Sequence, residues 1–337
     1  MTGDRSAAGY SGSLTDVAGL VVGHYTDKVN GTGCTVVLCD EPATAGMEVR
    51  GAAPGSRETE LLHPLASATW VNGVVLTGGS AFGLDAAGGA VRYLEEKGAG
   101  IKFGRARIPL VPSAVIFDLS FITHLVRPTA DDAYAACSDA AAKFETGSVG
   151  AGTGATVGKL RGAARSIKCG VGTASVRLPG GAIVSALMVV NAVGSIVDPA
   201  SGRIVAGPIA NDRRAGPFED SVDILINDPP RDRGFFRNTV IGVVATDAKI
   251  DKIGASRLAV AGQDGIALAV RPSHTTSDGD TVFALSTGRH PDPVGPDTLH
   301  AAALKAVTGA ILNAVDTATG LGGVLSAREA REHGSTD

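Results

Sequence analysis

Short runs that are apolar at successive positions constrain the fold of this chain most. They are rich in valine and isoleucine, as in TVIGVVAT and AIVSALMVV. A strand with one wet face alternates apolar and polar residues, whereas these runs are apolar on both faces. We therefore expect sheets that are covered on each side. The expected strands are Val17–Val22, Thr35–Asp40, Gly73–Leu76, Ala182–Val190, Val222–Ile226, Thr239–Thr246 and Thr281–Ser286.

Segments with helical signals lie between these runs. Ser80 is a suitable N-cap residue, and glycines follow the ends of two of the segments. In the last segment, apolar residues recur every three or four positions and form one stripe. Helices of this kind cover the faces of a sheet, so the fold class is α/β. The expected helices are Ser80–Lys97, Ala130–Phe144, Ser256–Ala269 and Leu299–Val315.

The composition is that of a compact globular protein. Of 337 residues, 46 are glycine, 44% are hydrophobic and 19% are charged, which favours tight turns and close packing of helix on sheet. The formal charge is −4, and no dense run of lysine or arginine is present. The chain therefore lacks the electrostatic signature of a protein that binds nucleic acid or an anionic membrane. A small molecule is the expected partner.

Several sequence features point to the cytoplasm. The first sixteen residues have no apolar core after the basic residue, so they do not resemble a secretory signal. The most apolar window, Ala182–Val197, is interrupted by polar residues and is shorter than the roughly 20 residues of a spanning helix. The four cysteines form no CxxC pair and the histidines no HxxxH or HxH pair. We expect reduced, mostly buried thiols and neither a metal nor a cofactor.

One strand begins directly after an exposed segment. Gly202–Gly234 carries NDRRAGPFED and NDPPRDRG, the composition of a surface loop, and Thr239 stands soon after it, at the start of an apolar run. If the chain were cut before Thr239, its new α-amine, with an ordinary pKa of about 7.7 to 8.0, would accept a proton from its own hydroxyl. A threonine whose hydroxyl only completes a turn fits this spacing as well.

Six ordered motifs carry a resemblance over about Asp16 to Ala327. The chain resembles the L-aminopeptidase/D-esterase family of self-processing N-terminal-nucleophile hydrolases, which includes β-peptidyl aminopeptidases, and within it most resembles the 6-aminohexanoate-oligomer (nylon-oligomer) hydrolases. The motifs are LTGGSAFGLDAAGG at Leu76–Gly89, PSAVIFDL at Pro112–Leu119, GAGTGATVGK at Gly150–Lys159, VVNAVGSIVD at Val189–Asp198, NTVIGVVATDA at Asn238–Ala248 and RPSHTTSDGDTVFALSTG at Arg271–Gly288.

The resemblance implies a fold and a processing event. The fold is a four-layer αββα sandwich of the N-terminal-nucleophile-hydrolase kind, formed by the single domain 1–337. The chain would cut itself between Asn238 and Thr239, leaving a larger fragment 1–238 and a smaller fragment 239–337. The implied activity is hydrolysis of small peptides or linear amides without a cofactor. A homo-oligomer, a tetramer of processed protomers, is implied as well.

The resemblance also assigns catalytic roles to five residues. Thr239 matches the nucleophile, and Lys159 matches a lysine beside it, which would lower the pKa of a nearby ammonium by repulsion and orient the hydroxyl. Asn191 matches the asparagine that stabilises the oxyanion. Asp278 and Asp280 match paired aspartates near the new N-terminus. In an extended backbone their carboxylates point the same way, which suits holding and orienting the Thr239 amine.

The substrate-binding residues are less closely defined. Gly78, Gly79 and Ser80 form a tight turn that we interpret as a wall of the substrate cleft. Phe117 stands where the family often has tyrosine, whose phenol is thought to help the oxyanion or position the substrate. Part of that role is absent here or has moved, so the substrate preference of relatives transfers poorly to this chain.

Three other interpretations differ in function. An acyltransferase of the ornithine acetyltransferase kind has a similar strand after its threonine, and would pass the acyl group to an amine instead of water. An uncleaved, non-catalytic binding protein is the second. A nucleotide-binding loop at Gly150–Lys159 is disfavoured, because Thr153 replaces the first glycine of the motif and Leu160 the magnesium-binding hydroxyl.

Overall fold

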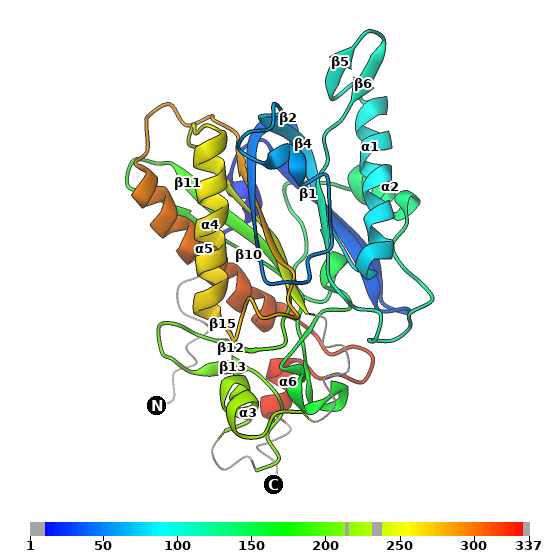
Figure 1. The fold of residues 1–337 in the computed structure, drawn as a ribbon, viewed down its shortest axis with the longest axis vertical. Helices are drawn as coiled ribbons and strands as arrows, with labels where there is room; N and C mark the ends of the chain where they lie inside the picture. Colours follow the sequence, from blue (N-terminus) through cyan, green and yellow to red (C-terminus); the bar gives the residue numbers. More distant parts are fainter. Residues whose placement is uncertain (1–10, 213–215, 231–237, 333–337) are drawn as a thin grey trace.

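The secondary structure is stacked in four layers (Figure 1). The computed structural model describes residues 11–212, 216–230 and 238–332. Helices α4 (Lys252–Ala269) and α5 (Pro296–Thr317) form one outer layer, and α1 (Ala87–Glu96) and α2 (Ala130–Ser138) form the other. The strands lie between them. The expected αββα sandwich is thus confirmed.

A long strand joins the two inner layers. The first half of β2 pairs with β1 and β4, and its last seven residues, from Thr44 to Arg50, pair with β16. The strand order is β10-β11-β14-β16-β2-β4-β7-β3, with β1 also on β2. The strands are β1 (Leu20–Asp27), β2 (Thr32–Arg50), β3 (Ser56–Arg57), β4 (Trp70–Thr77), β7 (Ser113–Val115), β10 (Val171–Arg177), β11 (Ile183–Asn191), β14 (Thr239–Thr246) and β16 (Asp280–Ser286).

Three hydrophobic clusters separate the four layers. Along β14, Ile241 and Val243 point into the cluster between the two halves of the sheet, where they join Val37 and Leu76. Val244 and other residues of the opposite face of β14 pack under α4 and α5. A third cluster lies under α1 and α2. Both faces of β14 are therefore buried, as its unbroken apolar sequence predicts.

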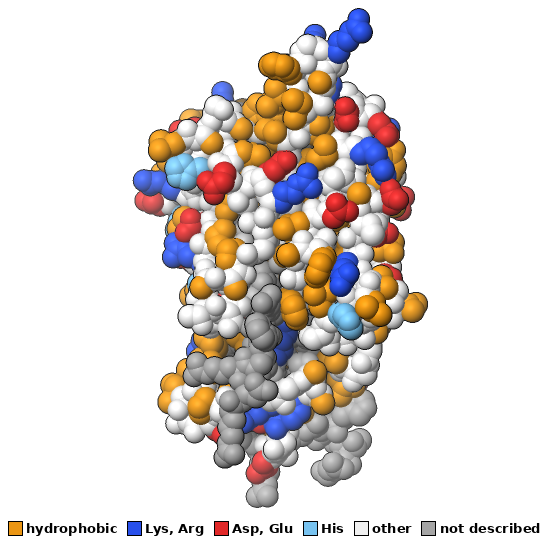
Figure 2. Space-filling model, turned by 45° about the vertical axis from the view of Figure 1, so that its right-hand side comes forward, with side chains coloured by type: hydrophobic (Ala, Val, Ile, Leu, Met, Phe, Trp, Pro, Cys, Tyr) orange, Lys and Arg blue, Asp and Glu red, His pale blue; other side chains and the backbone are white. Residues whose placement is uncertain are grey.

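Shorter elements lie around the sandwich. The hairpin of β5 (Ile101–Phe103) and β6 (Ala106–Ile108) projects at the top of Figures 1 and 2. Figure 2 also shows acidic and basic side chains interspersed on this face. The others are β8 (Thr156–Val157), β9 (Ile167–Lys168), β12 (Ser195–Val197), β13 (Ile204–Ala206), β15 (Val270–Arg271), α3 (Ser221–Asn227), α6 (Ala327–Glu332) and the 3-10 turns η1 (Leu14–Asp16), η2 (Glu60–Leu62), η3 (Ser80–Ala86), η4 (Gly150–Gly152), η5 (Lys159–Arg161) and η6 (Ala163–Arg165).

Two expectations about local structure are wrong. Val222–Ile226 lies in helix α3 instead of a strand, because the Asp220 side chain caps the first turn and the buried positions are three residues apart. Ser80 is not an N-cap residue: it has φ 53° itself and begins the 3-10 turn η3, whose N-cap is Gly79 with φ 83°. The regular helix α1 starts only at Ala87.

Two further segments have regular structure. Residues Ala327–Glu332 form α6, in which Ala327 and Ala330 are buried. Within the expected loop Gly202–Gly234 the chain forms β13 and α3. Residues 213–215 and 231–234 of this expected loop, and residues 235–237 after it, lie outside the described residues.

Helix α5 is a core element. Among the described residues it is the one helix long and apolar enough to cross a membrane by length and composition, but 67% of its most apolar window is buried inside the fold. Its apolar residues join the cluster that covers β14 and β16. All four cysteines are free and buried, as expected.

Candidate active site

Thr239 and Asn191 lie directly opposite each other on two neighbouring strands. Thr239 is the first residue of β14 and Asn191 the last of β11, and the antiparallel register pairs them directly. Thr239 is 6% exposed and Asn191 is fully buried. The sequence places a hydroxyl and an amide at the ends of two apolar runs, and the register brings them together.

The peptide bond before Thr239 is held from one side by the segment 277–279. Asn238 forms a parallel bridge with Asp278. Its N–H donates to the Ser277 carbonyl at 3.2 Å, and its own carbonyl oxygen accepts from the Gly279 N–H at 3.2 Å. The Thr239 hydroxyl donates to the same Asn238 oxygen. The Thr239 hydroxyl is therefore in contact with the carbonyl group of the preceding peptide bond.

The polar side chain of Asn238 is buried. It is 1% exposed, and neither its Oδ1 nor its Nδ2 has a hydrogen-bond partner among the described residues. It lies on the wall of a pocket of about 500 Å³. The described lining residues of this pocket are Phe117, Asp118, Ser120, Phe121, Gly154, Thr156, Lys159, Ala163, Ala164, Ser166, Asn238, Gly322, Gly323 and Val324.

Lys159 binds Asn191. Its Nζ donates to Asn191 Oδ1 at 2.7 Å and to the Asn191 carbonyl at 3.1 Å, while Asn191 Nδ2 donates to the Phe117 carbonyl at 3.1 Å. Burial lowers the pKa of Lys159 to about 7, against the opposing charges of Asp278 and Asp118. Lys159 thus orients the side-chain amide of Asn191, the residue opposite Thr239 in the sheet.

The two aspartates have separate partners. Asp280 Oδ1 accepts from the Val240 N–H at 2.7 Å, and Asp280 Oδ2 accepts from His274 Nδ1 at 2.8 Å. Asp278 Oδ2 accepts from the Thr275 N–H at 2.7 Å. Burial raises the pKa of Asp278, and the charge of Asp280 raises it further. Asp280 fixes the start of β14, while Asp278 lies in the turn that holds Asn238.

The turn Gly78–Ser80, which we expected to bind substrate, contacts Asp118, a lining residue of the pocket. The Gly79 N–H donates to Asp118 Oδ1 at 2.7 Å, and Thr32 Oγ1 donates to Asp118 Oδ2 at 2.7 Å. A Cβ on Gly78 would lie 2.1 Å from Asp118 Oδ2, so only glycine fits there. Gly78, Gly79 and Ser80 are not themselves among the described lining residues, whereas Phe117 is.

Two buried charged residues were not identified from the sequence: Asp118, which lines the pocket, and Lys168, whose Nζ lies 5.7 Å from the ring centroid of the lining residue Phe121. Asp118 is 4% exposed, and its burial raises its pKa. Lys168 is fully buried and donates to the carbonyls of Gly152, Ala155 and Cys169 at 2.9, 3.0 and 2.5 Å. Asp118 follows an apolar run inside one of the six motifs, which was a usable signal. No sequence signal marks Lys168, because its partners are backbone carbonyls, which a residue pattern does not specify.

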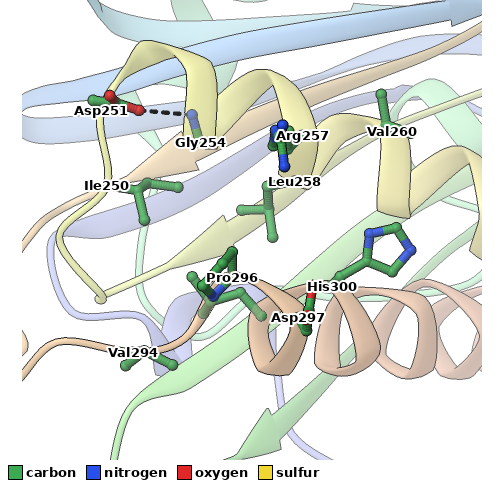
Figure 3. A pocket seen from close by; sticks show the side chains of 11 residues that line it. Ile250, Asp251, Gly254, Arg257, Leu258, Val260, Val294, Pro296, Asp297 and His300 are labelled. Atoms are coloured by element: carbon green, nitrogen blue, oxygen red, sulfur yellow. Dashed lines mark hydrogen bonds between the residues drawn. The ribbon is translucent and has the colours of Figure 1, made fainter.

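A second pocket lies away from these residues (Figure 3). It has a volume of about 410 Å³ and is formed by α4, α5 and the segments before them. Its polar residues include Arg257, Asp297 and His300. None of the expected site residues is among its described lining residues, whereas Phe117, Lys159 and Asn238 line the pocket of about 500 Å³.

Comparison with protein families gives one match over most of the chain. The model of peptidase family S58 matches residues 12–328. An uncharacterized aminopeptidase of Mycobacterium tuberculosis is 44% identical over 289 residues, which cover 82% of this chain and 81% of the relative. A 6-aminohexanoate-oligomer endohydrolase of Paenarthrobacter ureafaciens is 30% identical over 308 residues, 88% of this chain and 82% of the relative.

A solved structure shares the fold. It is described as the L-aminopeptidase D-Ala-esterase/amidase from Ochrobactrum anthropi, a prototype for the serine aminopeptidases and a variant of the Ntn hydrolase fold. The TM-score is 0.69 at 21% identity, and the match covers 96% of this chain and 94% of that chain. The likeness thus extends over the whole sandwich.

Proposed function

This chain belongs to peptidase family S58 and is a hydrolase of peptide or amide bonds, and on that basis we propose that it is a self-cleaving N-terminal-nucleophile enzyme that acts through Thr239. The observation that carries the proposal is the contact of the Thr239 hydroxyl with the Asn238 carbonyl. The precursor is a single domain 1–337, and the active form consists of residues 1–238 and 239–337.

Self-cleavage begins with attack of Thr239 Oγ1 on the Asn238 carbonyl carbon. The bond from that carbon to the Thr239 nitrogen breaks, the nitrogen takes up the hydroxyl proton, and an ester joins the two residues. Water then adds to the ester, releases the Asn238 carboxylate and restores the hydroxyl. The Gly279 N–H, already on the carbonyl oxygen at 3.2 Å, supports this step because it stabilises the negative charge that develops there.

Turnover repeats the same chemistry on a substrate amide. The Thr239 hydroxyl attacks the substrate carbonyl, and its own amine accepts the proton and passes it to the leaving amine. Asn191 stabilises the oxyanion: its Nδ2 donates one hydrogen to the Phe117 carbonyl, and the second, which has no partner among the described residues, is donated to the substrate. Lys159 holds Asn191 through Oδ1. Asp278 and Asp280 hold and orient the Thr239 amine.

The substrate we propose is a small peptide or a linear amide such as a 6-aminohexanoate oligomer. Support comes from the activities for which the relatives are named and from the pocket, where aromatic Phe117 and Phe121 lie beside the charged groups of Asp118 and Lys159. Such a lining suits an acyl chain that is apolar along its length and polar at one end. Gly79 contributes by donating to Asp118, Gly78 by leaving room for that carboxylate, and Ser80 by holding the turn through its N–H, which donates to the Ile116 carbonyl at 3.0 Å.

Two further features stay predictions. We propose that processed protomers assemble into a tetramer, which sedimentation equilibrium of the purified protein tests directly. The cytoplasmic location expected from the first residues is tested by fractionation of cells that express the chain. A monomeric active enzyme, or recovery of the protein outside the cytoplasm, would contradict the respective prediction.

The activity is tested with purified protein, short peptides and 6-aminohexanoate oligomers. Wild-type protein should release free amines, Thr239→Ser should retain part of this activity, and Thr239→Ala should have none. Each reaction is repeated with ornithine added as acyl acceptor. Acyl-ornithine formation in place of hydrolysis would favour the acyltransferase, and identical behaviour of wild type and Thr239→Ala would exclude Thr239 as the nucleophile.

A further inference from the structure

A histidine outside the five proposed catalytic residues is built into the site. His274 lies in the turn before β16 with φ 56°, a left-handed conformation in which histidine and asparagine are enriched among residues other than glycine. Its Nδ1 lies 2.8 Å from Asp280 Oδ2, and its Nε2 lies 3.3 Å from the Gln263 carbonyl oxygen. The ring therefore bridges helix α4 and the aspartate that holds the start of β14.

The partners of His274 decide its charge. The Gln263 carbonyl oxygen only accepts, so Nε2 must carry a hydrogen. Asp280 already accepts from the N–H groups of Val240 at 2.7 Å and of His274 itself at 3.2 Å, which favours its carboxylate form. Nδ1 must then carry a hydrogen as well. With both ring nitrogens protonated, His274 is an imidazolium paired with a buried carboxylate.

The surrounding charges agree with this assignment. Burial alone would lower the pKa of His274, but the hydrogen bond to Asp280 and the charge of Asp280 outweigh it and raise that pKa above 6.5. Arg50, which is paired with Glu48 at 2.7 Å, opposes the rise. Asp278 belongs to the same group, because the charge of Asp280 raises its pKa and the charge of Lys159 lowers it. The His274–Asp280 pair therefore lies among charged side chains of both signs.

Asp280 binds the N–H of the residue directly after Thr239. After cleavage, the free amine of Thr239 lies one residue from this contact. A lone buried carboxylate at that distance would favour the protonated amine, which cannot act as a base. A cation bound to the same carboxylate opposes that effect.

We propose that His274 is a positioning residue that, as an imidazolium, offsets the charge of Asp280 and so keeps the amine of Thr239 unprotonated and ready to act as base. The inference rests on the proposed function, since it requires a free Thr239 amine. A purely structural brace between α4 and β16 is the competing account, and it makes no statement about the amine.

The experiment measures protonation of the Thr239 amine directly. Processed wild type and His274→Asn are labelled with trace acetic anhydride from pH 5 to pH 10, and mass spectrometry quantifies acetylation at the N-terminus of fragment 239–337. Asparagine suits the backbone conformation, and its amide can donate to Asp280 without a charge. Because the lost cation no longer opposes the ammonium, the labelling midpoint should move to higher pH by about 1 pH unit.

The control is His300→Asn. His300 is a surface histidine that lines the pocket of Figure 3, and its Nε2 lies 3.2 Å from Asp264 Oδ2. Its midpoint should equal that of wild type. Equal midpoints for His274→Asn and wild type would overturn the inference, whereas absence of a fragment beginning at Thr239 in wild type would overturn the proposed function instead. If His274→Asn does not fold, NMR titration of His274 and trace labelling of the Thr239 amine in wild type decide: the proposal requires that His274 lose its proton at a higher pH than the amine does, and a His274 midpoint below that of the amine overturns it.

Discussion

The backbone N–H of Gly279 donates a 3.2 Å hydrogen bond to the carbonyl oxygen of Asn238. This donor is in place before any reaction, so no reorganisation is needed when negative charge develops on that oxygen. Asp278, the neighbour of Gly279, is anchored in turn, because its carbonyl accepts from the Ala53 N–H at 2.9 Å. The turn 277–279 is therefore fixed from both sides.

Replacing Gly279 should slow self-cleavage. A Cβ at this position would lie 2.4 Å from the Ala53 carbonyl oxygen and 2.7 Å from Pro54 Cα, both backbone atoms. In Gly279→Ala the turn must shift, and the donor moves with it. Loss of one oxyanion donor typically costs about 10² to 10³ in rate, so we expect at least a tenfold slower cleavage, measured as the disappearance of the intact chain on gels.

Gly180→Ala is the matched control, because nothing lies within 4 Å of the added Cβ. It should cleave at the wild-type rate. Equal rates for Gly279→Ala and Gly180→Ala would mean that the Gly279 donor does not contribute.

Removing the Asn238 side chain should cost little stability. Both of its polar atoms are buried without a partner among the described residues, and an unpaired buried polar group costs about 1 to 3 kcal/mol. Asn238→Ala removes this cost together with a small packing contribution. We expect the free energy of unfolding to stay within about 1 kcal/mol of the parent or to rise. Urea unfolding in the uncleaved Thr239→Ala background measures this, and a loss of about 3 kcal/mol would show that the amide has a strong partner.

Lys168 should make stability increase with pH. Burial lowers its pKa in the folded chain to about 7, from an ordinary value of 10.5. Between these two values the unfolded chain binds a proton that the folded chain does not, so the free energy of unfolding rises with pH, by up to about 1.4 kcal/mol per pH unit. Below pH 7 this contribution is flat.

The comparison that tests this is urea unfolding of the Thr239→Ala parent and of the same chain with Lys168→Met, at pH 7 and pH 9.5. The parent should gain more stability over this interval than the Lys168→Met chain. Lys249→Met, at an exposed lysine, should follow the parent. An equal gain in all three chains would contradict the prediction.

The two fragments should stay associated after cleavage. Strands β14 and β16 belong to the smaller fragment, yet they lie between β11 and β2 of the larger one. Separation would break the pairings β11–β14, β16–β2 and β12–β15 and expose the clusters on both faces of β14. We expect a single species in size-exclusion chromatography under native conditions and two bands on denaturing gels. Elution of separate fragments would show that the cut chain loses this sheet.

The strongest patterns predicted the fold well. The run TVIGVVAT gave the bounds of β14 without error, because a strand buried on both faces is apolar throughout. Val222–Ile226 has a similar composition but forms part of α3, since the side chain of Asp220 caps it and only one face is covered. A run of five residues contains too little periodicity to separate these two outcomes.

A residue pattern can predict a candidate site residue where a family motif contains a side chain that makes contacts of its own. Asn191, Lys159 and Asp280 meet around the start of β14 as the motifs indicate. The Gly279 N–H and the carbonyl partners of Lys168 are backbone groups, which a residue pattern does not specify. Such contacts depend on how distant segments pack.

The most direct test of the account is the intact mass of purified wild-type protein beside Thr239→Ala. We predict two masses for wild type, a fragment that ends at Asn238 and one that begins Thr-Val-Ile-Gly, and a single mass near 33.8 kDa for the variant. A wild-type chain that remains whole after prolonged incubation, or a Thr239→Ala chain that is cut at the same bond, would contradict self-cleavage by Thr239.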